Sequence, residues 1–163
     1  MTPSSETTTE SATGVTLNTI EVRFTGGMLA LNRILMTLQN KRMPVAGFTL
    51  GREAKPGGMR ATIVLDCPLE SALRYTALLS ALEDVQEAGP AEVMEVILLR
   101  TARDWRGAAE RVGVAAHESG GTVVASGEPE KVERFLASLG EGVEDTVRLG
   151  PVARPAGESW GGF

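Results

Sequence analysis

The pair Gly26-Gly27 has the clearest chemical potential in this sequence, because it joins a predicted strand to a predicted helix that begins near Met28. The unpaired N–H groups and the dipole at a helix N-terminus attract anions such as the carboxylate of an amino acid. Glycine also lets the backbone approach a ligand closely. The pair also fits a tight turn that needs positive φ angles and binds nothing, and the sequence alone favours this turn. Gly26 and Gly27 are therefore candidate effector-binding residues, with the tight turn as the alternative.

Two other residues could do chemistry. His117 is the only histidine and lies beside Glu118 on a predicted hairpin turn, where a solvated polar side chain is the usual occupant. Cys67 closes a predicted strand just before a helix, a position that can lower a thiol pKa, but no histidine or basic cluster is near it in the sequence. A small half-buried residue fits Cys67 better. We find no zinc spacing, paired-carboxylate signature, nucleophile elbow or nucleotide-binding glycine motif, and expect no catalytic residue and no metal site.

The charge pattern disfavours a nucleic-acid partner. The net charge is −5 and the sequence pI is near 5.0, which is the wrong sign for binding a phosphate backbone. A ferredoxin-like sheet that binds RNA needs stacking aromatic residues, and the first predicted sheet offers only Phe24 and Phe48. We therefore assign the basic residues of this region to a solvated polar surface; they are Arg23, Arg33, Lys41, Arg42 and Arg52.

Length and composition bound the protein class. The 163 residues suffice for one domain or two small ones, and one cysteine cannot form an internal disulfide. The longest apolar runs, such as 61–65, are strand-sized and too short to span a bilayer. Residues 1–16 lack the basic region and the apolar region that a secretory signal contains. Their Ser/Thr/Glu composition predicts disorder. We expect a cytoplasmic protein with no membrane association.

The first half reads as strand, helix, strand, strand, helix, strand. Ile20, Val22 and Phe24 alternate with Glu21 and Arg23 in the first strand. The helix that follows carries an apolar stripe at helical spacing, and Lys41 and Arg42 are predicted in its last turn; the stripe is Leu31, Ile34, Leu35 and Leu38. The later elements are a hairpin of strands 45–52 and 59–67, a helix from Pro68 to Asp84, and a strand over 85–88.

The second half repeats this order. We predict an apolar strand over 93–100, a short helix over 103–110, a hairpin of 112–116 and 122–126, a helix from 128, and a last strand over 143–149. The fold class is thus α+β, with two ferredoxin-like βαββαβ modules. The predicted domains are a disordered tail over 1–16, modules over 17–89 and 90–153, and a flexible tail over 154–163. Each sheet has one face without helices, which we expect to be buried against another surface.

The residues just described resemble the regulatory (small) subunit of acetolactate synthase, also called acetohydroxyacid synthase. In the first half the likeness covers Thr19 to Val85 and is clearest at Leu31-Asn32-Arg33-Ile34, followed by Lys41-Arg42 and the strand 45–50. In the second half it covers Thr122 to Gly157, through the helix segment 126–136 and the closing strand 147–153. The order and spacing of these pieces across most of the chain make the likeness specific.

The resemblance implies a particular organisation and role. The first module is similar to an ACT domain, which forms homodimers by pairing sheet edges, and the second to the family's C-terminal ferredoxin-like domain. Such a chain is not an enzyme: it binds and stimulates the large subunit, which holds thiamine diphosphate, magnesium and FAD, in the biosynthesis of valine, leucine and isoleucine. No cofactor is implied in this chain. Many members also confer feedback inhibition by a branched-chain amino acid.

The sequence departs from the family where an effector binds. The effector loop usually has an asparagine and then a glycine before the helix, and here these positions are Gly26 and Leu29. The turn after the helix has Pro44 where the family has an asparagine. Loss of two hydrogen-bonding amides weakens a polar site by roughly 1–3 kcal/mol each, so we expect weak or absent valine feedback. A free-standing tandem ACT-type amino-acid sensor with another partner is the alternative, and a small enzyme on this scaffold is disfavoured.

Overall fold

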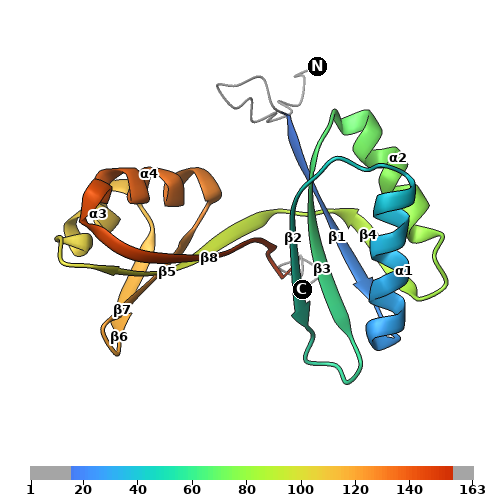
Figure 1. Cartoon of the computed structure of the whole chain (residues 1–163), viewed down its shortest axis with the longest axis horizontal. Helices are drawn as coiled ribbons and strands as arrows, with labels where there is room; N and C mark the ends of the chain where they lie inside the picture. The colour runs from blue at the N-terminus through green and yellow to red at the C-terminus, as the bar shows by residue number, and fades with distance from the viewer. Residues whose placement is uncertain (1–15, 156–163) are drawn as a thin grey trace, which may run out of the picture. The chain divides into compact units, whose positions relative to one another are not determined.

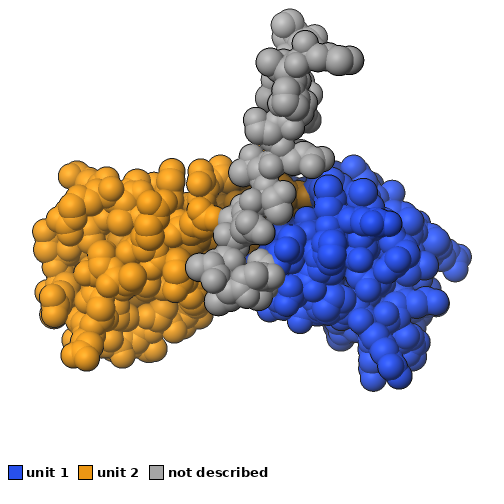
Figure 2. All heavy atoms as spheres, turned by 90° about the horizontal axis from the view of Figure 1, so that it is seen from above, with its two compact units in different colours: residues 1–90 blue, residues 91–163 orange. Residues whose placement is uncertain are grey.

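The computed structural model describes residues 16–155. The chain divides into two compact units, Met1–Pro90 and Ala91–Phe163 (Figure 2). The predicted tails 1–16 and 154–163 lie outside the described residues, except for Thr16, Arg154 and Pro155. Within 16–155 no helix has the length and apolar character needed to cross a membrane.

Unit 1 has the predicted order of elements (Figure 1). Its four strands form one antiparallel sheet in the order β2-β3-β1-β4, so the first strand lies inside the sheet and β2 lies at an edge. Both helices pack on the same face. The elements are β1 (Leu17–Phe24), α1 (Gly27–Asn40), β2 (Val45–Arg52), β3 (Met59–Asp66), α2 (Leu69–Ser80) and β4 (Val85–Pro90).

The core of unit 1 confirms the strand pattern and corrects the helix pattern. Ile20, Val22 and Phe24 are all buried, as their alternation predicts. In α1, however, the buried residues follow an i, i+4, i+8 row and include an alanine that the sequence analysis passed over; they are Ala30, Ile34 and Leu38. Leu35 was predicted in this stripe and is exposed, because it lies on the side of α1 that borders the β2 edge. Lys41 and Arg42 follow the end of α1 rather than forming its last turn.

The helix-free face of unit 1 carries ion pairs. Arg60 Nε lies 2.7 Å from Glu21 Oε1, and Arg23 Nε lies 3.2 Å from Glu53 Oε1. Arg23 also pairs with Glu87 on the adjacent strand. These opposite charges lie close together across the strands, although Glu53 Oε1 and Arg60 Nε are buried without a hydrogen bond of good geometry. Thr62 and Val64, which lie on the same face of β3 as Arg60, are nonetheless buried, and the expectation that this face is buried against another surface stays a prediction.

Unit 2 repeats the topology, with sheet order β6-β7-β5-β8, all neighbours antiparallel. The α+β fold class of two ferredoxin-like modules is thus confirmed. Figure 1 shows α3 and α4 together on one face of this sheet. The elements are β5 (Val93–Thr101), α3 (Trp105–Val112), β6 (Ala115–Ser119), β7 (Thr122–Gly127), α4 (Pro129–Leu139), the short 3₁₀ turn η1 (Gly140–Gly142) and β8 (Val143–Ala153).

Two predicted boundaries in unit 2 are wrong. His117 and Glu118 belong to β6, not to the hairpin turn, because the chain reverses at Gly120-Gly121, where both φ angles are positive. The last strand extends to Ala153 and is longer than its apolar pattern indicated. Beyond it, Arg154 N–H donates to the carbonyl of Glu92 at 2.8 Å.

Candidate functional site

The loop between β1 and α1 places Gly26 and Gly27 at the start of the helix. Gly26 is the N-cap residue with φ 101°, and Gly27 is the first helical residue with φ 61°. No side chain caps this end, and the first turn contains no acidic residue. The backbone N–H groups of the first turn have no helical acceptor, so this end of α1 presents positive potential without a protein anion in the turn itself.

The two glycines differ in what surrounds them. A Cβ on Gly26 would lie 3.1 Å from Cβ of Ala30 and 3.2 Å from Oδ1 of Asp84, whereas a Cβ on Gly27 would meet nothing within 4 Å. Thr25 N–H also donates to the carbonyl of Asp84 at 3.1 Å. Gly26 is therefore needed by the turn itself. Gly27 faces open space, where a ligand can approach the backbone.

A charged pair stands beside this turn. Arg33 Nη1, on the second turn of α1, lies 2.5 Å from Oδ2 of Asp84, which precedes β4. The turn thus brings together N–H donors, a carboxylate and a guanidinium within one small region. Such a set can bind a zwitterion. Its carboxylate would accept hydrogen bonds from the backbone N–H groups, and its ammonium would pair with the Asp84 carboxylate. Asp84 is 57 residues from Gly27 along the chain, so the sequence alone gives no sign that the two residues lie together.

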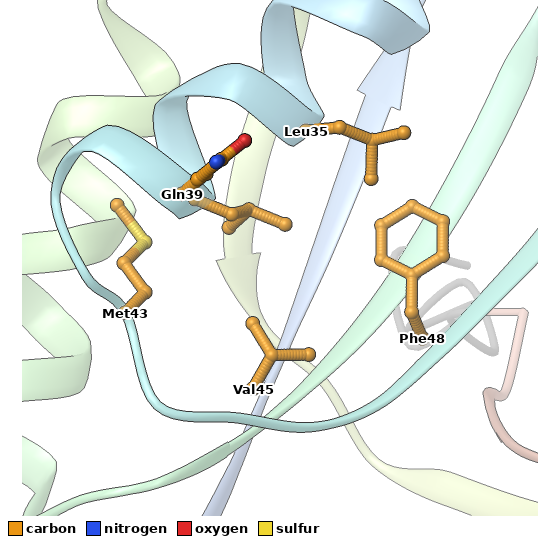
Figure 3. Close-up of a pocket in the computed structure, with 6 residues that line it drawn as sticks. Leu35, Gln39, Met43, Val45 and Phe48 are labelled. Carbon is orange, nitrogen blue, oxygen red and sulfur yellow. The ribbon is translucent and has the colours of Figure 1, made fainter.

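The second feature of unit 1 is an apolar hollow at the β2 edge. Its volume is about 280 Å³, and Figure 3 shows Leu35, Val45 and Phe48 around it. Gln39 supplies the one polar side chain of the lining; the full set is Leu35, Leu38, Gln39, Met43, Val45 and Phe48. In the described sheet β2 pairs only with β3, so its other side is an edge of that sheet.

The outer surface of α1 is also apolar. Met28, Leu29, Leu35 and Met36 are all exposed, and they recur at spacings of seven residues, which puts them along one side of the helix. Leu35 also lines the hollow, so this stripe and the β2 edge are continuous. An apolar helix side of this kind, beside an edge strand, is typical of a surface that contacts another chain.

The structure tests the alternatives for Cys67 and His117. Cys67 is buried, and burial followed by the charge of Asp66 raises the pKa of its thiol. The thiol is therefore protonated at neutral pH and is a poor nucleophile. His117 is exposed on β6. Within 16–155 no three His, Cys, Asp or Glu side chains gather as metal ligands would.

The basic and aromatic residues also have structural positions. Arg23 and Arg33 are engaged in ion pairs with acids. Phe24 is buried and Phe48 packs against the core, both on the helix-covered side of the sheet. Neither aromatic ring lies on the helix-free face, where a nucleic-acid base would stack. These positions favour the solvated polar surface over a nucleic-acid surface.

Comparison with known proteins identifies the fold. No protein-family model and no curated protein sequence matches this chain. Among solved structures, the acetolactate synthase small subunit from Thermotoga maritima matches with a TM-score of 0.71 and 16% identity, covering 86% of this chain and 97% of that one. The regulatory subunit of aspartate kinase from Thermus flavus covers 78% of this chain and 95% of its own at 12% identity, but its TM-score of 0.44 is too low to support an argument. At 16% identity the first match shows a shared fold, so the chain has the two-module architecture of an acetolactate synthase small subunit.

Proposed function

We propose that the chain is a regulatory and activating subunit of acetolactate synthase, a non-catalytic protein of the cytoplasm that acts in branched-chain amino-acid biosynthesis. The observation that carries this proposal is the architectural match over 86% of the chain and 97% of the Thermotoga small subunit. Catalysis would reside in a large subunit with thiamine diphosphate, magnesium and FAD. The residues that resemble the family by sequence, 31–34 and 126–136, lie on the helices α1 and α4 and at the end of β7.

The proposed homodimer forms through the ACT-like unit 1. β2 is an edge strand of the described sheet, and the apolar hollow and the α1 stripe beside it supply surface to bury. Pairing of β2 with β2 of a second copy would extend the sheet across the dimer.

The effector site is proposed at Gly26-Gly27, which would hold the carboxylate of an amino acid by backbone N–H groups while Asp84 accepts its ammonium. This site lacks the amide side chains expected for strong valine binding, so we expect isothermal titration to give a valine dissociation constant above the micromolar range. A micromolar constant would contradict the weak-feedback part of the proposal.

The main test is reconstitution. Purified chain should have no acetolactate-forming activity alone, and should raise the turnover of the acetolactate synthase large subunit from the same organism severalfold. Bovine albumin at equal mass serves as a control for non-specific stabilisation of the enzyme. Unchanged turnover on mixing, together with no co-migration of the two proteins, would overturn the proposal. In that case a free-standing amino-acid sensor, the second candidate, would be tested by identifying proteins that co-purify from native extract.

A further inference from the structure

β8 pairs with β5 in a register that its own apolar residues oppose. Val147 and Leu149 alternate with Thr146 and Arg148 along this strand. Apolar residues in such an alternation are expected to face the covered side of a sheet, here the side under α3 and α4. Val147 and Leu149 are instead 49% and 46% exposed, and it is Arg148 that contacts α4, through Glu133.

Cross-strand pairing shows which face each of these residues occupies. Arg148 is the partner of Ile97, which is buried in the core together with residues of α3 and α4. Val147 is the partner of Leu98. Partners share a face, whereas successive residues of one strand point to opposite faces. Val147 and Leu149 therefore lie on the helix-free face of unit 2, and Arg148 lies on the helix-covered face.

The buried carboxylate of Glu95 accounts for this reversal. Glu95 lies on the same side of β5 as Ile97, and Nε and Nη2 of Arg148 both donate hydrogen bonds to its carboxylate. Among the residues that the structure describes, Arg148 is the one cation in an ion pair with Glu95. A buried carboxylate without a cation is strongly destabilising, because neither water nor an opposite charge compensates it. The pair therefore opposes the preference of the apolar residues.

A bulge in β8 produces the observed register. Between the pairs Met94–Val152 and Val96–Leu149, β5 advances by two residues and β8 by three. The extra residue lies beside Gly150, whose φ of 144° is a conformation that favours glycine. A bulge moves every residue on one side of it by one position, and a shift of one position exchanges the two faces of a strand.

Without this bulge, β8 would have a second register, shifted by one residue. Leu149 would then pair with Ile97, and Arg148 would pair with Leu98. Val147 and Leu149 would both face the helices, as their alternation with polar residues favours. The guanidinium of Arg148 would lie on the helix-free face and could no longer reach the buried side of β5.

We propose that Glu95 holds β8 in the observed register, and that β8 takes the shifted register when the carboxylate is removed. In the native chain the shifted register would leave Glu95 buried without its cation, which disfavours it. Removal of the carboxylate abolishes this cost, and burial of Val147 and Leu149 then favours the shift. Glu95 thus determines whether unit 2 presents apolar side chains or the Arg148 guanidinium on its helix-free face.

Disulfide trapping in the full chain, with Cys67 replaced by alanine, measures the register. Arg100 is the partner of Asp145 in the observed register and would be the partner of Thr146 in the shifted one. Directly opposed residues lie within the Cα separation that a disulfide spans, whereas residues on opposite faces point apart. Mild oxidation followed by alkylation and intact-mass analysis gives the rate of cross-linking. With Glu95 present, Arg100→Cys with Asp145→Cys should cross-link at least tenfold faster than Arg100→Cys with Thr146→Cys.

Glu95→Leu should reverse this preference, so that the pair at 100 and 146 cross-links at least tenfold faster. Adding Arg148→Met should restore the original preference, because a methionine can remain buried under α4 in the observed register. Glu133→Gln is the matched control: it removes the contact of Arg148 with α4 but keeps the Glu95 pair, and it should leave the preference unchanged. A preference that stays the same in Glu95→Leu would overturn the inference.

Circular dichroism checks that each variant is folded. If Glu95→Leu unfolds, Glu95→Gln keeps the size of the side chain and one hydrogen bond to Arg148, and should lower the original preference by about threefold. An unchanged preference in Glu95→Gln would then overturn the inference. Equal cross-linking of the two cysteine pairs in a folded Glu95→Leu chain would also overturn it, by showing that β8 loses its pairing rather than taking a second register.

Discussion

Glu95 and Arg148 form a two-point ion pair inside unit 2. The carboxylate of Glu95 is 3% exposed on β5, and it accepts hydrogen bonds from both Nε and Nη2 of Arg148 on β8, the latter at 3.0 Å. Arg148 Nη2 also lies 2.9 Å from Glu133 Oε2 on α4. The hydrogen bond with Glu95 raises the pKa of Arg148 above its ordinary value, so the guanidinium stays charged at any accessible pH. One side chain thus joins two strands and a helix.

Removal of Arg148 should destabilise unit 2 strongly. Arg148→Met leaves the Glu95 carboxylate buried without a partner, and we expect a loss of about 3 kcal/mol in the free energy of unfolding. Urea denaturation followed by circular dichroism measures this loss. The double variant Arg148→Met with Glu95→Met removes both charges and should recover most of the lost free energy of unfolding. Arg148→Lys should have a stability between those of the native chain and Arg148→Met. Equal stabilities of the single and double variants would contradict a buried unpaired charge as the cause.

Substitution of Gly26 and of Gly27 by alanine should lower the stability of the fold by unequal amounts. Gly26→Ala meets Ala30 and Asp84 in a left-handed backbone conformation, and we expect a loss of about 1–3 kcal/mol. Gly27 also has a positive φ angle, but an added Cβ would meet no atom within 4 Å. Gly27→Ala should therefore lower the free energy of unfolding by only about 1–2 kcal/mol. Thermal unfolding of both variants and the native chain gives the comparison. A larger loss for Gly27 than for Gly26 would show that the packing at Asp84 does not constrain the turn.

Cys67 should react slowly and should make stability fall in alkali. Burial raises its pKa above the ordinary value of 9.0, so the folded state holds the thiol proton more tightly than the unfolded state. The stabilisation is then fully present below the unfolded pKa and is lost as pH rises through the folded pKa. The free energy of unfolding, measured between pH 7 and 10.5, should decline more for the native chain than for Cys67→Ala. Rapid modification by Ellman's reagent at neutral pH in the native state would argue against burial.

The β2 edge should control association of unit 1. Leu35→Glu places a carboxylate on the exposed side of α1 beside the apolar hollow, and it should raise the self-dissociation constant by at least tenfold. Leu69→Glu, at an exposed leucine at the start of α2, is the matched control. Analytical ultracentrifugation of both variants tests the proposal. An identical constant for Leu35→Glu and the control would place the contact elsewhere.

The sequence predicted best the strands in which apolar and polar residues alternate. Alternation in β1 and β3 identified Ile20, Val22 and Phe24 and their partners, because one side of a strand faces the helices throughout. The stripe of α1 was less accurate, since an amphipathic pattern does not reveal how much of a helix its sheet covers. Leu35 falls just beyond the covered part and borders the hollow.

The sequence alone could not predict which polar residues, far apart along the chain, would pair in the fold. Glu95 and Arg148 are separated by 53 residues, and Glu95 interrupts an otherwise apolar strand whose pattern gave no hint of a charge partner. Asp84 escaped notice beside Gly26 for the same reason. The charged face of unit 1 was visible in Glu21 and Arg23, which alternate with the core residues. Only the register of β1 with β3 and β4 shows that Arg60 and Glu87 complete it.

The open side of β2 has a consequence for producing this protein. Neither proline nor lysine occurs within β2, and the irregularity in its register with β3 lies at one end, between Val45 and Gly47, so the rest of the strand can accept a stray extended segment. A variant whose β2 can no longer pair with a second copy would accumulate molecules with an uncovered template for fibrous growth. After overexpression Leu35→Glu should therefore aggregate more than Leu69→Glu.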